Sequence, residues 1–421
     1  MSDLVCVAAN AVLSYQRALG TVSNNIANVG TEGYSRQEVV LKSNPVSRVG
    51  TVYLGTGVSV ESVKRQFDTF VEANLRKSNS DLASQEPMVN YSNRVIDIMG
   101  SSSMGLTSAI DQFFSAARNL SSDPGSTVMR SSFVRDSENL ASRFGELSAQ
   151  LDLVQSETDE ATKSYVNSMN TIFKQLATVN MQLTKQKSAS AQPPDLLDQR
   201  DLLLKDLSSY AQIRTGFSEN GSVTVSLGPS LTRDVVVDGG KHFMLGTNFN
   251  SAAPEKVSLV LNPYGEATSL TGLTGGKLSG IMSFREQILG SSRSSLDTLA
   301  NNFVKEVNTI HSSGIDAYGN TGVDLFTIGK SSVGSAGTVK VAFNDALKVS
   351  AAAQFRIIES PNNTSSADAS IQFIGTPTNG PAPISSIISN NSNAAAAITV
   401  TAKSSTPMAA VATIQNGLTD I

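Results

Sequence analysis

The residue types that carry out most enzyme chemistry are scarce in this sequence. It contains two histidines, His242 and His311, and one cysteine, Cys6. Neither histidine has metal-ligating residues at the spacing that zinc sites use, so we interpret both as polar surface or helix-end positions. Asp198 and Asp201 stand three residues apart, which puts both carboxylates on one face of a helix. Salt-linked surface groups explain this pair more simply than an acid and a base of a catalytic site.

Two further segments resemble ligand-binding loops without meeting their requirements. Residues 272–278 are one residue short of a phosphate-binding loop, and Leu278 stands where a Ser or Thr would hold magnesium. Asp316, Asn320 and Asp324 do not follow the ligand order of a calcium-binding EF-hand. We therefore predict a loop that leads into a helix and a turn between helix and strand. The sequence predicts no cofactor, no metal site and no enzymatic activity.

The N-terminus carries a pattern that is typical of helix packing. Residues recur there at alternating steps of three and four, which forms one narrow seam along a helix. We call this set the N-terminal seam: Val5, Ala8, Val12, Tyr15, Leu19, Val22, Ile26 and Val29. Most such stripes face an ordinary core, but this one lies at the extreme terminus and keeps strict heptad phase. It predicts a helix over residues 3–28 that packs on partner helices and ends near Gly30 and Gly33.

This helix is not expected to be stable alone. Full burial of a seam side chain contributes roughly 1.5–3 kcal/mol. Ordering each helical residue costs ~1–2 kcal/mol of backbone entropy, over about 25 residues. We therefore expect the helix to be marginal in the isolated chain and to order when it packs among neighbouring subunits.

A second and longer stripe predicts the helical body of the protein. Its members are Leu140, Phe144, Leu147, Leu151, Val154, Thr158, Ala161, Tyr165, Met169, Ile172, Leu176, Val179 and Leu183. They predict a helix over about residues 130–187 that lies in a bundle or coiled coil, with two successive steps of four that locally unwind the coil. Shorter helices are predicted at 106–120, 195–210 and 277–312, and one from about residue 67 that is interrupted near Pro87.

Short β-type runs separate these helical regions and complete the predicted architecture. They lie at 223–225, 235–237 and 257–261. The fold class is α+β multidomain, with an N-terminal coiled-coil-type helix, a middle domain built as a bundle of long helices, and outer β-rich domains. The predicted divisions are the N-terminal helix with its following extended segment at 1–62, the helical middle domain at 63–214 plus 266–334, and the outer β-rich segments at 215–265 and 335–421.

Composition excludes several classes of protein. The chain has 421 residues, enough for two or three domains, and a formal net charge of −4 without a basic patch, which argues against nucleic-acid binding. No stretch is apolar for long enough to span a membrane, so we predict no membrane insertion. Asp3 stands where a secretory signal would be positively charged, and the segment before Cys6 is too short for a lipoprotein signal.

Residues 23–37 give the most specific signal in the chain. They read Ser-Asn-Asn-Ile-Ala-Asn-Val-Gly-Thr-Glu-Gly-Tyr-Ser-Arg-Gln, and they resemble the N-terminal signature of the flagellar axial proteins, which are the rod, hook and hook-associated proteins. The signature residues are Asn24, Asn25, Asn28, Gly33, Tyr34, Ser35, Arg36 and Gln37.

Further blocks narrow the resemblance. The block at residues 55–76 begins with the order G-x-G-V-x-V-x-x-V-x-R-x-x-D-x-F and continues to Leu75 and Arg76. It is similar to the segment after the first helix of axial proteins. Leu-Leu-Asp-Gln-Arg-Asp stands at 196–201, and the stretch from 276 to 326 runs from Gly-Lys-Leu-Ser-Gly to Asp-Leu-Phe. This ordered set, over roughly residues 1–330, is most similar to the hook-associated protein 1 family.

The resemblance implies a structural function. A member of this family forms the junction zone between hook and filament by helical self-assembly, with the seam in subunit packing and the polar signature residues in contacts between subunits. It implies as partners further copies of itself, hook protein, a second hook-associated junction protein and a flagellar export chaperone. It also implies an extracellular place on the flagellum, reached by type III export of the unfolded chain without a Sec signal.

The sequence ends at Ile421 without the C-terminal helix that pairs with the N-terminal one in this family. We expect a shortened form of the protein, as opposed to a departure from the family plan. Two alternatives for the function stay open. Another axial protein, a rod or hook component, is disfavoured by Ser35-Arg36-Gln37 and the blocks at 196–201 and 276–326. A secreted coiled-coil adhesin would share helices and β modules but would not need the Asn-rich signature.

Overall fold

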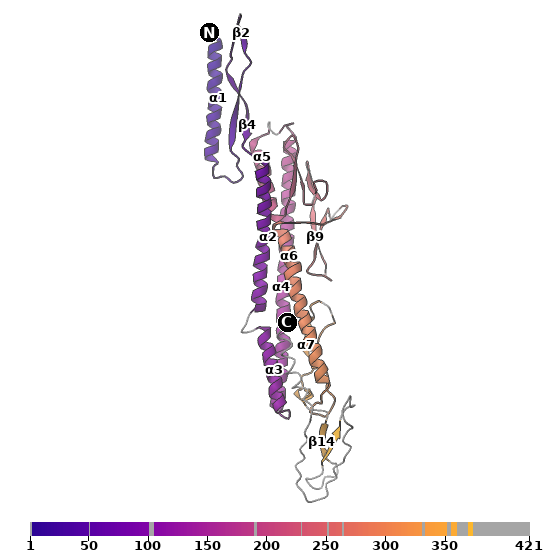
Figure 1. The fold of residues 1–421 in the computed structure, drawn as a ribbon. Helices are drawn as coiled ribbons and strands as arrows, with labels where there is room; N and C mark the ends of the chain where they lie inside the picture. The colour runs from indigo at the N-terminus through magenta and orange to yellow at the C-terminus, as the bar shows by residue number, and fades with distance from the viewer. Residues whose placement is uncertain are drawn as a thin grey trace. The chain divides into compact units, whose positions relative to one another are not determined.

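The chain folds into two compact units, which the ribbon in Figure 1 follows along the chain. The first unit comprises residues 1–92 and 155–288, and the second comprises residues 93–154 and 289–421. The helices α2 (Thr69–Gly100) and α4 (Thr127–Leu183) contribute residues to both. The structure is a computed structural model that describes residues 2–49, 51–100, 105–188, 192–228, 230–250, 252–262, 265–330, 333–351, 355–359 and 369–373.

The first unit combines helices with four antiparallel sheets. Besides parts of α2 and α4, its helices are α1 (Ser2–Ala27), α5 (Pro194–Tyr210) and α6 (Gly276–Phe284). Its strands are β1 (Gln37–Ser43), β2 (Ser47–Val49), β3 (Val52–Leu54), β4 (Val58–Arg65), β5 (Arg214–Phe217), β6 (Val223–Ser226), β7 (Val235–Asp238), β8 (Lys241–His242), β9 (Leu245–Phe249), β10 (Val257–Leu261) and β11 (Thr268–Leu270). The predicted β runs are therefore confirmed as β6, β7 and β10.

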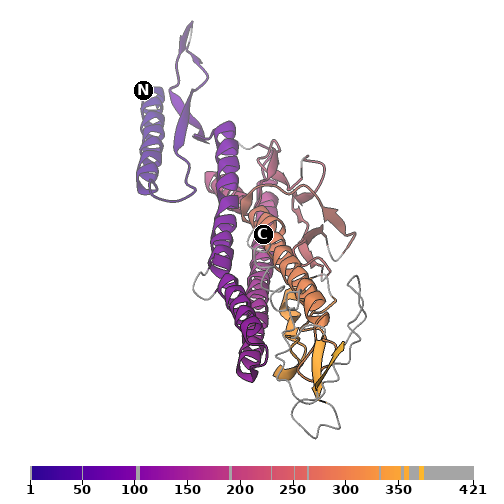
Figure 2. The same ribbon diagram turned by 60° about the horizontal axis from the view of Figure 1, so that its bottom comes forward.

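The helix α1 lies alongside a two-stranded ribbon made of β1 and β4, as both views show (Figures 1 and 2). The ribbon is antiparallel, with Gln37 opposite Arg65 and a register shift between Val40 and Leu41. The predicted N-terminal helix is thus confirmed. It ends at Ala27, so the last seam residue, Val29, lies in the turn that follows.

The core of the first unit forms where α4, α5 and α6 meet two sheets. The sheets have the strand orders β5-β6-β7-β8 and β11-β10-β9. The core side chains are Val166, Met169, Ile172, Phe173, Leu176, Ala177, Leu204, Leu207, Ala211, Val223, Val225, Leu227, Val236, Val237, Leu245, Leu259, Leu261, Leu270, Leu278 and Ile281. Alternate residues of β6 and β10 face this core, as expected of strands with one face buried.

The predicted interruption of α2 near Pro87 is wrong, because the helix runs through that residue. A proline inside a helix removes one backbone hydrogen bond and crowds the preceding turn. Here Gly280 of α6 lies so close that a Cβ on it would overlap the carbonyl oxygen of Ser84 and contact the Pro87 ring. We attribute the intact helix to this packing, which only a glycine at 280 permits.

The core of the second unit is rich in phenylalanine. Its elements, besides parts of α2 and α4, are α3 (Leu106–Ser122), α7 (Gly290–Ser312), β12 (Phe326–Thr327), β13 (Lys340–Val341), β14 (Phe355–Glu359), β15 (Ala369–Phe373) and the 3-10 turns η3 (Ser335–Thr338) and η4 (Ala346–Lys348). The fully buried rings are Phe113, Phe114, Phe133, Phe144, Phe303 and Phe326. The ring of Phe113 lies 5.2 Å from those of Phe133 and Phe303, so residues of α3, α4 and α7 share one aromatic core.

The long stripe of α4 is confirmed as a buried face. Each member is buried except Ala161 and Tyr165, which are half-buried. The helices predicted at 106–120 and 195–210 are α3 and α5. The one predicted at 277–312 contains a π-helical turn, η2 (Arg285–Leu289), between α6 and α7. The turn begins at Arg285, whose wholly buried guanidinium pairs with Asp159 of α4.

Long helices together with several antiparallel sheets confirm the predicted α+β multidomain class. The three-part division at 1–62, 63–214 plus 266–334, and 215–265 with 335–421 stays a prediction. Much of the last segment, including residues 360–368 and 374–421, lies outside the described residues. Within the described part of the chain, no helix is both long and apolar enough to cross a membrane.

Candidate assembly surface and the junction that positions it

The N-terminal seam is exposed along its whole length. All eight of its residues are exposed, and the larger ones keep more than half of their surface in contact with solvent, for example Leu19 at 67% and Ile26 at 69%. An apolar row of this regularity is unusual on the surface of a folded unit. It is a surface that a partner could bury.

The opposite face of α1 packs on the β1–β4 ribbon with small and polar residues. Ser14 is buried, and its Oγ lies 2.7 Å from the carbonyl oxygen of Asn10 and 3.3 Å from that of Val58 in β4. Ala11 and Ala18, one turn to either side, are half-buried. The helix is therefore held to the ribbon by its less apolar face, which leaves the seam uncovered.

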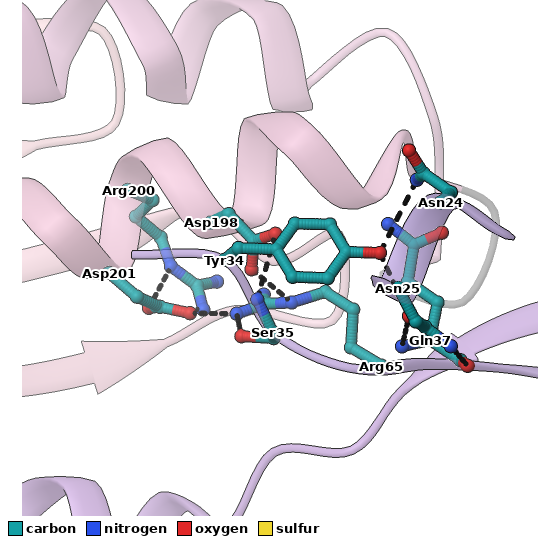
Figure 3. A network of polar contacts seen from close by, with 9 residues as sticks. All are labelled: Asn24, Asn25, Tyr34, Ser35, Gln37, Arg65, Asp198, Arg200 and Asp201. Carbon is teal, nitrogen blue, oxygen red and sulfur yellow. Dashed lines mark hydrogen bonds and ion pairs between the residues drawn. The ribbon is translucent and has the colours of Figure 1, made fainter. Parts of the chain in front are cut away.

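A junction of polar side chains joins the end of α1 to the start of β1 (Figure 3). Asn25 Nδ2 donates to the carbonyl of Gln37 at 2.8 Å, and Asn25 Oδ1 accepts the Gln37 N–H at 2.9 Å. The same oxygen accepts the Tyr34 hydroxyl at 2.8 Å, and Asn24 Nδ2 donates to that hydroxyl at 3.3 Å. Asn25 thus bonds the N–H and C=O of Gln37 as a neighbouring strand would, and it also orients Tyr34.

A buried ion cluster ties this junction to α5 (Figure 3). Arg65 Nη2 lies 2.7 Å from Asp201 Oδ2 and donates to Ser35 Oγ at 3.0 Å, while Arg65 Nε lies 2.9 Å from Asp198 Oδ1. Arg200 Nη2 donates to the other Asp201 oxygen at 2.7 Å. The four charged side chains are each about nine-tenths buried. The predicted salt linkage of Asp198 and Asp201 is right, but their predicted place on the surface is wrong.

Burial shifts the pKa of two groups in this junction. Desolvation, reinforced by Asp198 and Asp195, raises the pKa of Tyr34, whose hydroxyl donates to Asn25. Desolvation lowers the pKa of Arg200, and the adjacent Asp201 carboxylate opposes that shift. Because guanidinium stays protonated in proteins, the cluster remains ionic.

The structure brings most of the signature residues into this junction. Asn24, Asn25, Tyr34, Ser35 and Gln37 share one network. In the turn before it, Gly33 has a positive φ of 80° and lies against Leu202 of α5, which favours glycine there. Asn28 is half-buried and bonds back to Asn24, and Arg36 is exposed. The predicted contacts of these residues between subunits are untested and stay a prediction.

The residues considered above for catalysis, metal binding or ligand binding lie at the following places in the fold. His242 is exposed in β8. His311 lies in the last turn of α7, so its predicted helix-end position is confirmed, and it is fully buried there. Asp316 Oδ1 accepts the Asn320 N–H at 2.7 Å in a turn, and residues 272–275 form the loop before α6. Across the described ranges, no group of three or more His, Cys, Asp or Glu residues could hold a metal ion.

Asn308 and His311, near the end of α7, have a structural role that was not predicted from the sequence. Asn308 Nδ2 donates to the carbonyl of Phe326, and Asn308 Oδ1 accepts the N–H groups of Leu325 and Phe326. His311 Nδ1 lies 2.5 Å from the carbonyl of Val323, and its Nε2 accepts the Ser350 N–H at 3.0 Å. The spacing Asn-x-x-His places both side chains on one helix face, which was the available signal.

The family follows from comparison with known proteins. A family model described as the flagellar hook-associated protein FlgK helical domain matches residues 92–326, which is more than half of the chain. The chain belongs to this family. The family predicted from the sequence resemblance is therefore confirmed.

Relatives of the FlgK family match the chain outside that domain as well. Flagellar hook-associated protein 1 of Escherichia coli (strain K12) is 28% identical over 339 residues, covering 79% of this chain and 61% of that protein. The protein of the same description from Bacillus subtilis (strain 168) is 27% identical over 372 residues, covering 80% and 73%. The chain thus spans about 60% of the length of its enteric relatives.

A solved structure shares the fold. The flagellar hook junction protein FlgK from Burkholderia pseudomallei superposes with a TM-score of 0.60 at 19% identity, covering 69% of this chain and 68% of that one. At this identity the likeness shows the fold of the FlgK family and does not by itself assign a function.

Proposed function

We propose that this chain is a structural component of the bacterial flagellum that forms the junction zone between hook and filament by helical self-assembly. The observation that carries the proposal is the N-terminal seam, which stays exposed on a chain of the FlgK family. An apolar surface of heptad spacing gains free energy only when another helix covers it. A filamentous assembly supplies such helices from neighbouring copies.

The junction described above supports this role by holding α1 in place. The clamp of Asn25 on Gln37 and the buried ion cluster of Arg65 connect α1 through β1 and β4 to α5. In this proposal the half-buried Asn28 and the exposed Arg36 contact neighbouring subunits, whereas the remaining signature residues stabilise the fold of the chain.

The partners and place of the protein follow from the same proposal. They are further copies of this chain, hook protein, a second hook-associated junction protein and an export chaperone, on the extracellular flagellum and after export without a Sec signal. The role is structural and involves no catalysis. The three-part division predicted from the sequence would then place the helical regions towards the axis and the β-rich segments outside.

The experiment that tests the proposal is electron microscopy of cells lacking the gene, combined with an assay for flagellin in the medium. Hooks without filaments, together with shed flagellin, are the expected result. Normal filaments would contradict the proposal and favour a secreted adhesin. Loss of the hooks as well would assign the chain to the rod or hook.

A further inference from the structure

A buried cation on α2, Arg76, lacks a hydrogen-bond partner among the described residues. Arg76 is 5% exposed, and in the part of the chain that the structure describes its guanidinium forms no hydrogen bond or ion pair. Its Nη1 is completely buried. Burying a charge without a partner is among the costlier arrangements in a protein, and natural folds rarely keep one without compensation.

The neighbouring carboxylates attract Arg76 without binding it directly. Glu72 and Asp201 both attract it, but the two oxygens of Asp201 already pair at 2.7 Å, one with Arg65 and the other with Arg200. Asp198 pairs with Arg65. Arg200 repels Arg76. Arg76 therefore has attracting carboxylates nearby but no hydrogen-bonded carboxylate partner among the described residues.

Arg76 lines a basic groove within the first unit. The groove has a volume of about 680 Å³ and lies between α2 and the segment around β5. Its cations are Arg76, Lys77 and Arg214, and none of its lining residues is Asp or Glu. Lys77 and Arg214 are exposed and take part in no described ion pair. Ile213 and Leu231 supply apolar lining.

We propose that this groove binds an acidic peptide segment of a partner protein, with one carboxylate on Arg76 and further carboxylates on Lys77 and Arg214. A guanidinium binds carboxylate through two parallel hydrogen bonds, which makes arginine a good receptor for an acidic side chain. A single small anion would occupy one cation only. Three cations beside apolar residues fit a chain of carboxylates better. This inference does not depend on the proposed function.

The test uses the full chain and fluorescence anisotropy with a fluorescein-labelled hexaglutamate peptide, with hexalysine as the reverse-charge probe. We expect hexaglutamate to bind, with an affinity that falls as salt rises. The Arg76→Gln variant should weaken binding about tenfold or more, as for loss of a charge-assisted hydrogen bond. Lys77→Gln and Arg214→Gln should weaken it less, because both cations are exposed. Lys174→Gln, an exposed cation on α4, is the matched control and should change nothing.

A stability measurement keeps the proposal testable without the peptide. Replacing a buried charge that has no hydrogen-bond partner with an apolar side chain of similar length removes its desolvation cost. The Arg76→Met variant should therefore unfold at a higher urea concentration than the parent chain while losing hexaglutamate binding.

Four outcomes would overturn the proposal. They are no binding of hexaglutamate by the parent chain, equal losses in Lys174→Gln and Arg76→Gln, and competition by inorganic phosphate as strong as by unlabelled peptide, which would leave a simple anion site. The fourth is a lower stability of Arg76→Met, which would show that the fold itself already compensates the charge.

Discussion

At the scale of single residues, four asparagines on helices make the same pair of hydrogen bonds to the backbone. Each donates through Nδ2 to a backbone carbonyl and accepts through Oδ1 the N–H of the same residue, at 2.7–2.9 Å. The pairs are Asn25 with Gln37, Asn170 with Leu245, Asn180 with Val223, and Asn308 with Phe326. A side-chain amide has the donor and acceptor of a peptide group, so it can replace a missing strand neighbour. This explains part of the polar composition of the chain.

The buried member of this set should be costly to remove. Asn180 is wholly buried, and Asn180→Ala would leave the N–H and C=O of Val223 without that partner, which costs ~1–3 kcal/mol per unsatisfied group. Urea unfolding followed by circular dichroism measures the change. Asn167→Ala, an exposed asparagine on the same helix, should change stability by less than about 0.5 kcal/mol. Equal effects would contradict the clamp.

His311 makes the stability of the second unit dependent on pH. Burial lowers its pKa from the ordinary value of 6.5; Arg130 acts in the same direction, whereas the Val323 carbonyl and Asp324 oppose the shift. The ring is neutral when Nδ1 donates to Val323 and Nε2 accepts from Ser350. Protonation would remove the acceptor at Nε2.

The direction of the pH effect follows from proton uptake. Below pH 6.5, His311 binds a proton in the unfolded chain. In the folded chain it binds that proton only when the pH falls to its lower, folded pKa. The free energy of unfolding should therefore fall as the pH drops below 6.5, and be insensitive to this group above it. Urea unfolding across this range should show a smaller acid-dependent loss for His311→Gln than for the parent chain. His242→Gln, at an exposed position, should behave like the parent chain.

At the scale of elements, the spacing of apolar residues predicted which segments form helices with one apolar face. The α4 stripe and the α1 spacing are properties of the chain alone, and both helices lie within a few residues of their expected bounds. Features that depend on contacts with residues far away in the sequence could not be predicted. Pro87 stays helical because Gly280, from another helix, packs on it, and Asp198 is buried because Arg65, from a strand far along the chain, pairs with it. Neither contact has a local signal.

The same element scale gives a prediction about α1. Its described contacts are with the ribbon of β1 and β4, and its apolar face is exposed, so it has little tertiary packing to protect its amides. In the isolated chain, hydrogen exchange over residues 2–27 should be fast. Exchange over the buried part of α4, residues 166–180, should be slow and provides the internal control. Slow exchange in α1 would show a stable helix that does not wait for a partner.

At the scale of the whole molecule, the question is whether the N-terminal seam serves the fold or the assembly. Val12 and Leu19 are 56% and 67% exposed, so a charge at either position remains solvated in the isolated chain. The Val12→Asp and Leu19→Asp variants should therefore keep the circular dichroism and the unfolding midpoint of the parent chain. Their effect should appear only where the seam is covered by another helix, because burying an unpaired carboxylate is costly.

Motility then separates the two roles. If the seam packs between subunits, Val12→Asp and Leu19→Asp should abolish swimming and leave hooks without filaments, even though the purified chains are folded. Gln16→Asp adds the same charge to the same helix at an exposed position outside the seam, and should leave motility intact. Swimming by the two seam variants would rule out subunit packing through α1. Loss of fold in the purified variants would instead show that the seam is covered within the chain itself, and both results would reject the assembly surface proposed above.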